Sequence, residues 1–469
     1  KAHKTTYPLV QGPMAQVSDN PEFLSAVADS GSLPFFAMGI MSADNARKYL
    51  TRAKDKLGER PWGVGLLGFL PAELYKQQIE EVFKIKPPFA MLAGGRPDQA
   101  RALEKQGIST YVHVPAPGLI KPFLKQGIKK LVFEGRESGG HVGPLGNLPL
   151  WEASIARLEE EVQSLGQEDK QEFHVLFAGG IHDSLSAAMV AAASESLSRQ
   201  GIKIGLQMGT AYLFSQEAVQ SKAITSGYQE EALACKQTIT LEMGSGHANR
   251  CALSPFADRF YALRRGLLAE DNSGTKLTES LQEACLGRLR IAAKGIAKDR
   301  QGEYVNIDQE EQKREGMYLL GEAAALHNSV ISLQQLNEEV CQSGSKLLQR
   351  IKADNIDCSP GLAAESKPSN IAITGMAFFL PGASDLDTYW QNILQKKEVV
   401  TEVPQDYWDH RLVYDPDKTK GDKCYSKWGG FIEEVVFDPV AFGIPPKYVG
   451  HISPIQLIAL ETSRRALQD

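Results

Sequence analysis

The sequence has no long apolar run and no excess of basic residues, and we expect no signal peptide. Its longest apolar runs, such as residues 187–193, are far shorter than the ~20 residues that span a bilayer, so we expect no membrane association. The formal net charge of −6 provides no basic surface for a phosphate backbone, which argues against nucleic acid as a partner. With 469 residues, the chain is long enough for about two or three domains.

The chain also lacks a C-x-x-C pair. Its six cysteines are scattered, as is typical of a reducing compartment, and we expect a cytoplasmic protein without a zinc site. His247 and Cys251 are four residues apart, but two ligands without a second pair make a poor metal site, so we interpret this stretch as a structural or acyl-contacting loop. Because the first residue is Lys1 rather than Met, we expect an excerpt of a longer protein.

Short apolar segments and amphipathic helices alternate through the first half of the chain. The expected strands are residues 7–10, 34–38, 62–67, 89–92, 110–114, 131–133, 174–177 and 202–208. The expected helices include residues 20–30, 44–57, 71–83, 97–106 and 184–197. Eight such alternations are typical of a (β/α)8 TIM barrel, an α/β fold whose active site is formed by the loops at the C-terminal ends of the strands.

The sixth expected strand runs into a glycine-rich loop that carries a histidine. The glycines of this loop are Gly135, Gly139, Gly140 and Gly143. Without side chains they would let a flat ligand lie against bare backbone, and they place His141 at the C-terminal end of the strand. The alternative is a loop histidine among turn glycines, since such loops are common.

Glycines also follow the seventh and eighth expected strands. Gly179 and Gly180 come after one strand, and Gly209 with Thr210 comes after the next. TIM barrels often bind a phosphate at these two loops, where backbone N–H groups and a helix N-terminus converge on the anion. The sequence therefore predicts a phosphate site, with tight turns and helix caps as the alternative interpretation.

A glycine motif at residues 63–68 fits G-x-G-x-x-G. Pro61 leaves little room for a preceding strand, and the next strand does not end in a suitably spaced carboxylate. We therefore interpret the motif as a barrel strand that approaches a ligand, not as a dinucleotide-binding unit.

Composition changes divide the rest of the chain. We assign residues 1–230 to the barrel and residues 231–352, which are helical and charged, to a helical cap over the barrel mouth with C-terminal helices. Residues 353–369 lack periodicity and contain Pro360, Gly361 and Pro368, as a linker does. A second domain, residues 370–469, is expected to begin with a strand at 371–375 and a helix at 386–395, and to be cut short at Asp469.

Four motifs occur in order at the expected strand ends: VQGPMA at 10–15, ESGGHVG at 137–143, FAGGI at 177–181 and QMGTAYL at 207–213. Through them, residues 7–230 resemble the nitronate monooxygenase and flavin-dependent enoyl reductase superfamily. GHANRC at 246–251, GRLRIAAKG at 287–295 and GMYLLGEAAAL at 316–326 are similar to the branch found in polyunsaturated fatty acid and polyketide synthases, which is associated with enoyl reduction.

Residues 371–469 resemble the start of a β-ketoacyl synthase, a thiolase-like α/β domain. The motifs are IAITGMAFFLPGA at 371–383, WGGFI at 428–432, FDPVAFGI at 437–444 and SPIQLIALE at 453–461. The family places its nucleophilic cysteine and two histidines after the residues present here, and Cys424 lies in a polar, turn-like stretch without an evident base. The resemblance therefore implies a ketosynthase part that is incomplete and inactive in this chain.

The first resemblance implies FMN as the cofactor and His141 as the catalytic residue. The cofactor-binding positions that it implies are Gly12, Pro13, Met14, Gly65, Glu134, Gly139, Gly140, Gly179, Gly180, Met208, Gly209 and Thr210. Glu134 stands where the family commonly has glutamine, and Gly65 where many members have asparagine. A carboxylate beside the flavin disfavours its reduced, anionic form unless the site protonates it.

Our leading hypothesis is an FMN-dependent enoyl reductase that uses NAD(P)H to reduce a 2-enoyl thioester held by an acyl carrier protein within a multidomain synthase. His141 would supply the proton at the α-carbon. A nitronate monooxygenase (2-nitropropane dioxygenase) activity, with His141 as a base, is the second hypothesis. A catalytically degenerate docking scaffold is the third, and the residues at positions 134 and 65 keep it open.

Overall fold

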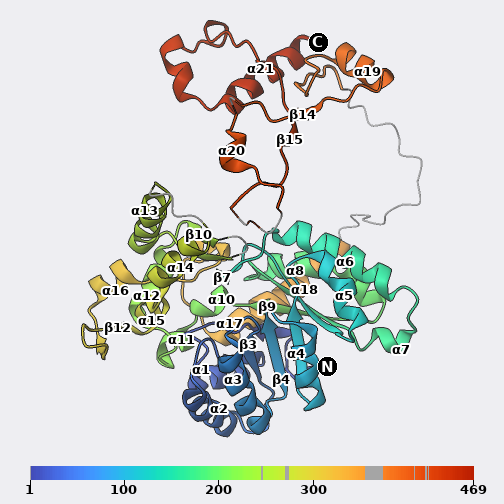
Figure 1. The fold of residues 1–469 in the computed structure, drawn as a ribbon. Helices are drawn as coiled ribbons and strands as arrows, with labels where there is room; N and C mark the ends of the chain where they lie inside the picture. Colours follow the sequence, from blue (N-terminus) through green and yellow to red (C-terminus); the bar gives the residue numbers. More distant parts are fainter. Residues whose placement is uncertain are drawn as a thin grey trace. The chain divides into compact units, whose positions relative to one another are not determined.

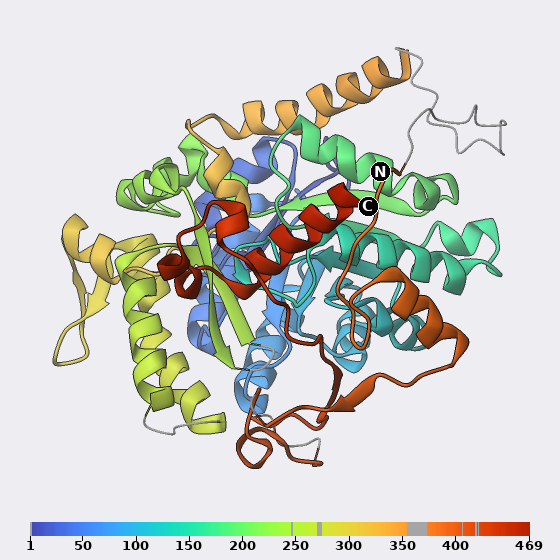
Figure 2. The same ribbon diagram turned by 90° about the horizontal axis from the view of Figure 1, so that it is seen from above.

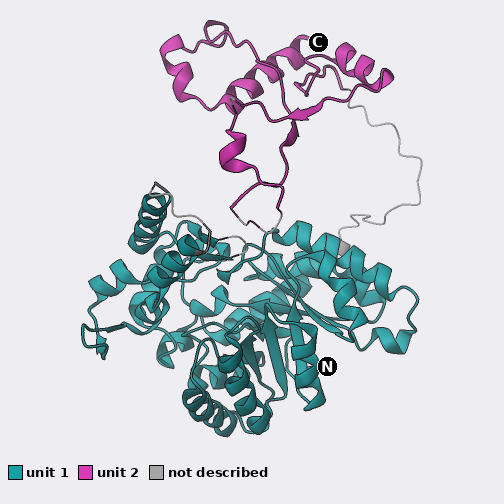
Figure 3. Ribbon diagram, viewed as in Figure 1, with its two compact units in different colours: residues 1–357 teal, residues 358–469 magenta. Residues whose placement is uncertain are grey.

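The chain forms two units, Lys1–Asp357 and Cys358–Asp469, which are described separately (Figure 3). The computed structural model describes residues 2–244, 247–269, 274–353, 373–405, 407–417, 420 and 422–469. The predicted linker at 353–369 lies outside these ranges except for residue 353. Within them, no helix has both the length and the apolar character needed to cross a bilayer.

Eight parallel strands of the first unit close into a barrel (Figure 1). The strands are β1 (Leu9–Gln11), β2 (Leu33–Ala37), β3 (Gly63–Leu67), β4 (Phe89–Ala93), β5 (Ser109–His113), β6 (Lys130–Glu134), β8 (His174–Ala178) and β9 (Lys203–Met208). Each pairs with the next, and β9 pairs with β1. The predicted (β/α)8 barrel is confirmed, and its strands lie within about two residues of the expected segments.

Helices surround the strands in both views (Figures 1 and 2). They are α1 (Pro21–Asp29), α2 (Ala43–Leu57), α3 (Ala72–Ile85), α4 (Pro97–Lys105), η1 (Pro117–Leu119), α5 (Ile120–Lys125), α6 (Asn147–Val162), α7 (Gln167–Lys170), α8 (Ser184–Ala193), α9 (Glu195–Arg199), α10 (Thr210–Leu213), α11 (Gln216–Gln220) and α12 (Ser226–Ala234). The single helix expected at 184–197 is two, because Ser194 ends α8 and its hydroxyl donates to the Val190 carbonyl oxygen at 2.7 Å.

The barrel separates two apolar layers. One cluster of buried side chains fills the interior, and a larger one lies between strands and helices. Successive residues of a strand point to opposite faces, so membership of these clusters tells which residues face inward. On β5, for example, Tyr111 lies inside and Val112 outside.

A chain of three polar side chains closes the N-terminal end of the barrel interior. The hydroxyl of Tyr111 lies 2.5 Å from Nε2 of His3 and 2.8 Å from Nδ1 of His174. Burial lowers the pKa of His3 to about 4 and that of His174 to about 3. Both imidazoles are therefore neutral in the folded protein at neutral pH.

This arrangement predicts a loss of stability in mild acid. Above pH 6.5, the pKa of a histidine in the unfolded chain, both states hold these histidines neutral. Below pH 6.5 the unfolded state binds a proton at His3, whereas the folded state binds it only near pH 4, so the free energy of unfolding falls between these values. We expect His3 alone to lower the free energy of unfolding by about 2 kcal/mol at pH 5 relative to pH 7.5. Urea unfolding at pH 7.5 and pH 5 measures this change in the free energy of unfolding. The change should be about 2 kcal/mol smaller for His3→Gln than for wild type, and equal changes would contradict the prediction.

The cap combines helices with antiparallel strands. Its helices are α13 (Pro255–Ala269), α14 (Gly274–Cys285), α15 (Arg288–Lys294), α16 (Gln309–Glu315), η2 (Glu322–Leu326), α17 (Leu333–Glu338), η3 (Glu339–Ser343) and α18 (Gly344–Ala353). Its strands are β10 (Thr238–Gly244), β11 (His247–Ala252), β12 (Ile296–Lys298) and β13 (Tyr304–Asn306). The sequence predicted only helices here; β10 and β11 instead form a hairpin that packs an apolar face onto Phe256, Phe260 and Leu281.

The second unit contains short elements and many exposed apolar side chains. Its elements are α19 (Leu386–Leu394), β14 (Val400–Glu402), α20 (His410–Val413), β15 (Trp428–Gly430), η4 (Val440–Phe442), η5 (Pro446–His451) and α21 (Pro454–Gln468). The helix expected at 386–395 is present as α19. The strand expected at 371–375 is wrong for its described part, because residues 373–379 pair with no strand among the described residues and a strand needs a partner.

Candidate active site

The mouth of the barrel is lined by small residues and three polar ones. Val132 faces inward and Phe133 outward on β6, so the next residue, Glu134, faces the interior. The same alternation turns His113 inward at the end of β5, and Gln207 inward on β9. In the described part of the chain, Nε2 of His113 and Oε1 of Gln207 are buried without a hydrogen-bond partner. Such orphaned atoms are expected where a polar ligand completes the site.

Glu134 and His113 form a pair at this mouth. Nδ1 of His113 lies 2.9 Å from Oε2 of Glu134, and only 17% and 22% of the two side chains are exposed. Their strands are neighbours, with His113 opposite Val132 in register. The carboxylate predicted to lie beside a flavin is thus already bonded to an imidazole.

His141 lies in β7 (Gly140–His141), a two-residue strand. It pairs with Asn249 of β11, and the Val142 N–H donates to the Ala248 carbonyl oxygen at 3.1 Å, so the cap hairpin fixes this loop. The ring is exposed and meets the ring of Phe69 edge to face, with centroids 5.6 Å apart. The histidine is therefore held at an open position by two segments far from it in sequence.

The pKa of His141 lies below its ordinary value. Surrounding protein atoms desolvate the imidazolium, nearby His247 adds repulsion, and Glu134 opposes both through attraction. At neutral pH the ring is mainly neutral, ready to accept a proton, and its protonated form is a stronger acid than a free histidine.

Several predicted cofactor positions pack against the chain itself. A side chain at Gly139 would overlap Leu320 and Gly321, and one at Gly65 would overlap Pro13 at 2.2 Å. Gly139 and Gly65 therefore serve close packing, which explains why no asparagine stands at position 65. The Met208 side chain lies in the outer apolar layer, so only its backbone faces the mouth, where its carbonyl oxygen accepts the Gly12 N–H at 2.9 Å.

The predicted phosphate loops lie at the ends of the adjacent strands β8 and β9. Gly179 and Gly180 adopt φ of 101° and 66°, which favours glycine, and a Cβ added at Gly209 would meet the sulfur of Met14 at 3.7 Å. In the described part of the chain, neither Gly180 nor Gly209 donates its backbone N–H to another residue. Two free donors on adjacent loops fit an anionic oxygen cluster.

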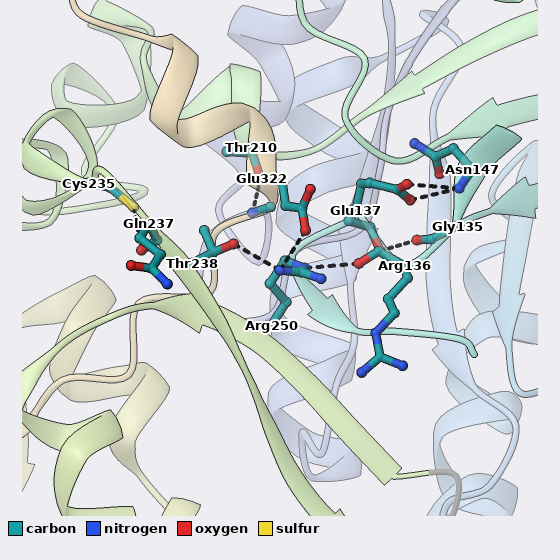
Figure 4. A network of polar contacts seen from close by, with 12 residues as sticks. Gly135, Arg136, Glu137, Asn147, Thr210, Cys235, Gln237, Thr238, Arg250 and Glu322 are labelled. Atoms are coloured by element: carbon teal, nitrogen blue, oxygen red, sulfur yellow. Dashed lines mark hydrogen bonds and ion pairs between the residues drawn. The ribbon is translucent and has the colours of Figure 1, made fainter. Parts of the chain in front are cut away.

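A network around Arg250 ties the cap to these loops (Figure 4). Arg250 is 8% exposed; its Nε donates to the Arg136 carbonyl oxygen at 2.9 Å, and its Nη1 lies 2.9 Å from both Thr238 Oγ1 and Glu322 Oε1. The Gly321 N–H donates to Oγ1 of Thr210 at 2.8 Å. Thr210 is the first residue of α10, and its hydroxyl accepts this hydrogen bond from the cap. Arg250 is buried whereas Glu322 is half exposed, so the arginine is the charge that depends on these partners.

His247 is exposed at the start of β11, whereas Cys251 is buried near its end. No cluster of three metal-binding side chains occurs among the described residues. Cys251 is buried in the apolar cluster beneath the hairpin, which raises the pKa of its thiol to about 12. Five cysteines are free thiols, and Cys358 lies outside the described residues.

Sequence reasoning missed His113, Phe69 and Arg250. His113 ends the fifth strand and Phe69 follows the third, so their position at strand ends was the available signal. Arg250 lies within the GHANRC motif, but nothing in the motif shows that its partners come from β10 and from residues 136 and 322.

Two family models match the chain. Residues 67–343, more than half of the chain, match the model described as nitronate monooxygenase, and residues 369–469 match that of the N-terminal domain of β-ketoacyl synthase. The two matches agree with the division into two units.

Solved structures resemble the first unit. FabK from Thermotoga maritima aligns with a TM-score of 0.59 and 21% identity, covering 75% of this chain and 97% of that one. The enoyl reductase domain of MlnA from Bacillus amyloliquefaciens aligns with a TM-score of 0.55 and 14% identity, covering 75% and 97%. At these identities the likeness establishes the fold.

The chain has relatives among polyketide synthases. Polyketide synthase ThaG of Burkholderia thailandensis is 40% identical over 100 residues, which is 21% of this chain and 2% of that protein. The chain therefore spans a small part of the curated relatives that it matches.

Proposed function

The chain belongs to the nitronate monooxygenase family, and we propose that it is an FMN-dependent enoyl reductase that acts on 2-enoyl thioesters within a polyketide synthase. The observation that carries the proposal is a set of polar groups at one barrel mouth that have no partner among the described residues: two backbone N–H groups on the β8 and β9 loops, and side-chain atoms of His113 and Gln207. The neighbouring ketosynthase segment supports a synthase, with an acyl carrier protein in the cytosol as the source of the thioester.

The residues present fit FMN. Gly180 and Gly209, where an added Cβ would meet nothing closer than 3.6 Å and 3.7 Å, would bind its phosphate, and the ring would lie beside Pro13 and Met14. FMN bound there would supply hydride chemistry, from NAD(P)H to the β-carbon of the enoyl group. His141 would donate the proton that the α-carbon needs, and Phe69 fixes the orientation of its ring.

The test is a comparison of substrates. The purified chain, loaded with FMN, is mixed anaerobically with NADPH and then with crotonyl thioester. We expect bleaching of the flavin absorbance by NADPH and its return with the thioester. A protein that takes up no FMN would instead support the docking scaffold.

Nitronate oxidation is a second candidate, which the lowered pKa of His141 favours. A base works in its neutral form, and this form predominates at neutral pH. The pH profiles separate the two: the acid role loses rate as pH rises through the pKa of His141, whereas the base role loses rate as pH falls through it. A nitronate supplied with oxygen provides the second assay.

We expect no condensing activity from residues 369–469. Cys424 is exposed, and its thiol donates to the Ser426 carbonyl oxygen at 2.9 Å, an acceptor that cannot take its proton. Incubation with a short-chain acyl thioester, followed by mass-spectrometric mapping, should give no preferential acylation of Cys424. Labelling that Cys424→Ser abolishes would contradict this.

A further inference from the structure

We propose that His113 is a flavin-contacting residue, held by Glu134 so that its Nε2 bonds the polar edge of the bound ring; the proposal rests on FMN binding as proposed above. Strand alternation turns both side chains into the mouth, and neither was expected to act on the other. Their contact is Nδ1 to Oε2 at 2.9 Å.

The contact fixes the tautomer of His113. An ionised carboxylate can only accept, so Nδ1 carries a proton, and in the neutral form of the ring Nε2 is left as an acceptor. Nε2 is buried and has no partner among the described residues. An N–H group on the edge of a bound heterocycle is the group that satisfies it, as a ligand-binding histidine is oriented by a bond to its other nitrogen.

The pair also changes the role of Glu134. An isolated carboxylate beside the ring would repel the reduced, anionic flavin, but hydrogen bonding to His113 delocalises this charge. The carboxylate is then a positioning residue for His113. Its replacement by glutamine removes the remaining negative charge and should raise the reduction potential of the flavin.

Two substitutions separate the nitrogens of His113. Asparagine keeps a donor at the δ position and removes Nε2, whereas glutamine places an amide near the ε position. We expect His113→Asn to raise the Kd of FMN roughly tenfold and His113→Gln to stay within about threefold of wild type. His174→Asn, which removes a half-buried histidine at the far end of the barrel, is the matched control and should leave the Kd unchanged.

Fluorescence quenching of FMN titrated with the apoprotein gives the Kd, and equilibration with redox dyes gives the potential. If wild type binds no FMN, the proposed function fails. If wild type binds and His113→Asn binds equally well, the present inference fails and water satisfies Nε2.

A measurement on the wild-type protein covers a variant that does not fold. With 15N-labelled histidine, the Nε2 resonance assigned to His113 should shift when FMN binds, while those of His3 and His174 stay in place. An unshifted His113 resonance in protein that has bound FMN overturns the proposal.

Discussion

His141→Ala should slow the reoxidation of reduced flavin by an enoyl thioester by about 10²- to 10⁴-fold, the usual value of a general acid. The α-carbon would have to take its proton from water without an oriented donor. FMN binding and flavin reduction by NAD(P)H should change little, because the phosphate loops lie on β8 and β9 while His141 lies on β7. Stopped-flow absorbance measures the two half-reactions separately.

His247→Ala is the control for this experiment. It removes an exposed neighbouring imidazole whose charge lowers the pKa of His141, so it should alter the pH profile slightly and leave both half-reactions within a few-fold of wild type. Wild-type rates in both half-reactions of His141→Ala would make it a loop histidine. Loss of FMN from that variant would give it a structural role.

The barrel was predictable because each of its elements has a local signal. Buried parallel strands appear as continuous apolar runs, and helices as apolar residues three and four apart, so their alternation determines the fold class. The cap was harder to predict. Its strands β10 and β11 have mixed burial and pair with each other, and β11 also pairs with β7, more than 100 residues earlier; such long-range pairing leaves no mark on the local sequence.

The same distinction between local signals and contacts distant in sequence applies to the candidate site. The loops at 141, 180 and 209 were predicted as site loops because glycines at strand ends are visible in the sequence, and the structure places these loops at the ends of barrel strands. Gly139 and Gly65 look the same in the sequence, yet one packs against residues 320–321 and the other against Pro13. A glycine that leaves space for a ligand and a glycine that packs against another part of the chain can be told apart only from the atoms that lie next to them in the structure.

The same reasoning applies to Glu134. In the sequence it departs from the family pattern and casts doubt on catalysis. In the structure Glu134 has a partner, because His113 ends the neighbouring strand and faces the same interior. Pairing across adjacent barrel strands depends on register, which the sequence does not reveal.

The phosphate loops allow an experiment in which charge alone decides the result. We expect Gly180→Asp combined with Gly209→Asp to abolish FMN retention, because each carboxylate repels a dianionic phosphate where free backbone N–H groups should meet it. A penalty of several kcal/mol corresponds to about 10³-fold in Kd. Flavin content after gel filtration and titration of the apoprotein with FMN measure the effect.

The matched variant is Gly180→Asn combined with Gly209→Asn. Asparagine has the size of aspartate without its charge, and both residues tolerate the φ of 66° at Gly180 about equally, so the strain is shared. An added Cβ meets nothing closer than 3.6 Å at Gly180 and 3.7 Å at Gly209, which leaves both pairs of variants room to fold. The asparagine pair should therefore bind FMN far more tightly than the aspartate pair. Equal affinities of the two double variants would show that no phosphate lies at these loops. Unchanged flavin content in the folded aspartate double variant would place the FMN phosphate elsewhere on the barrel.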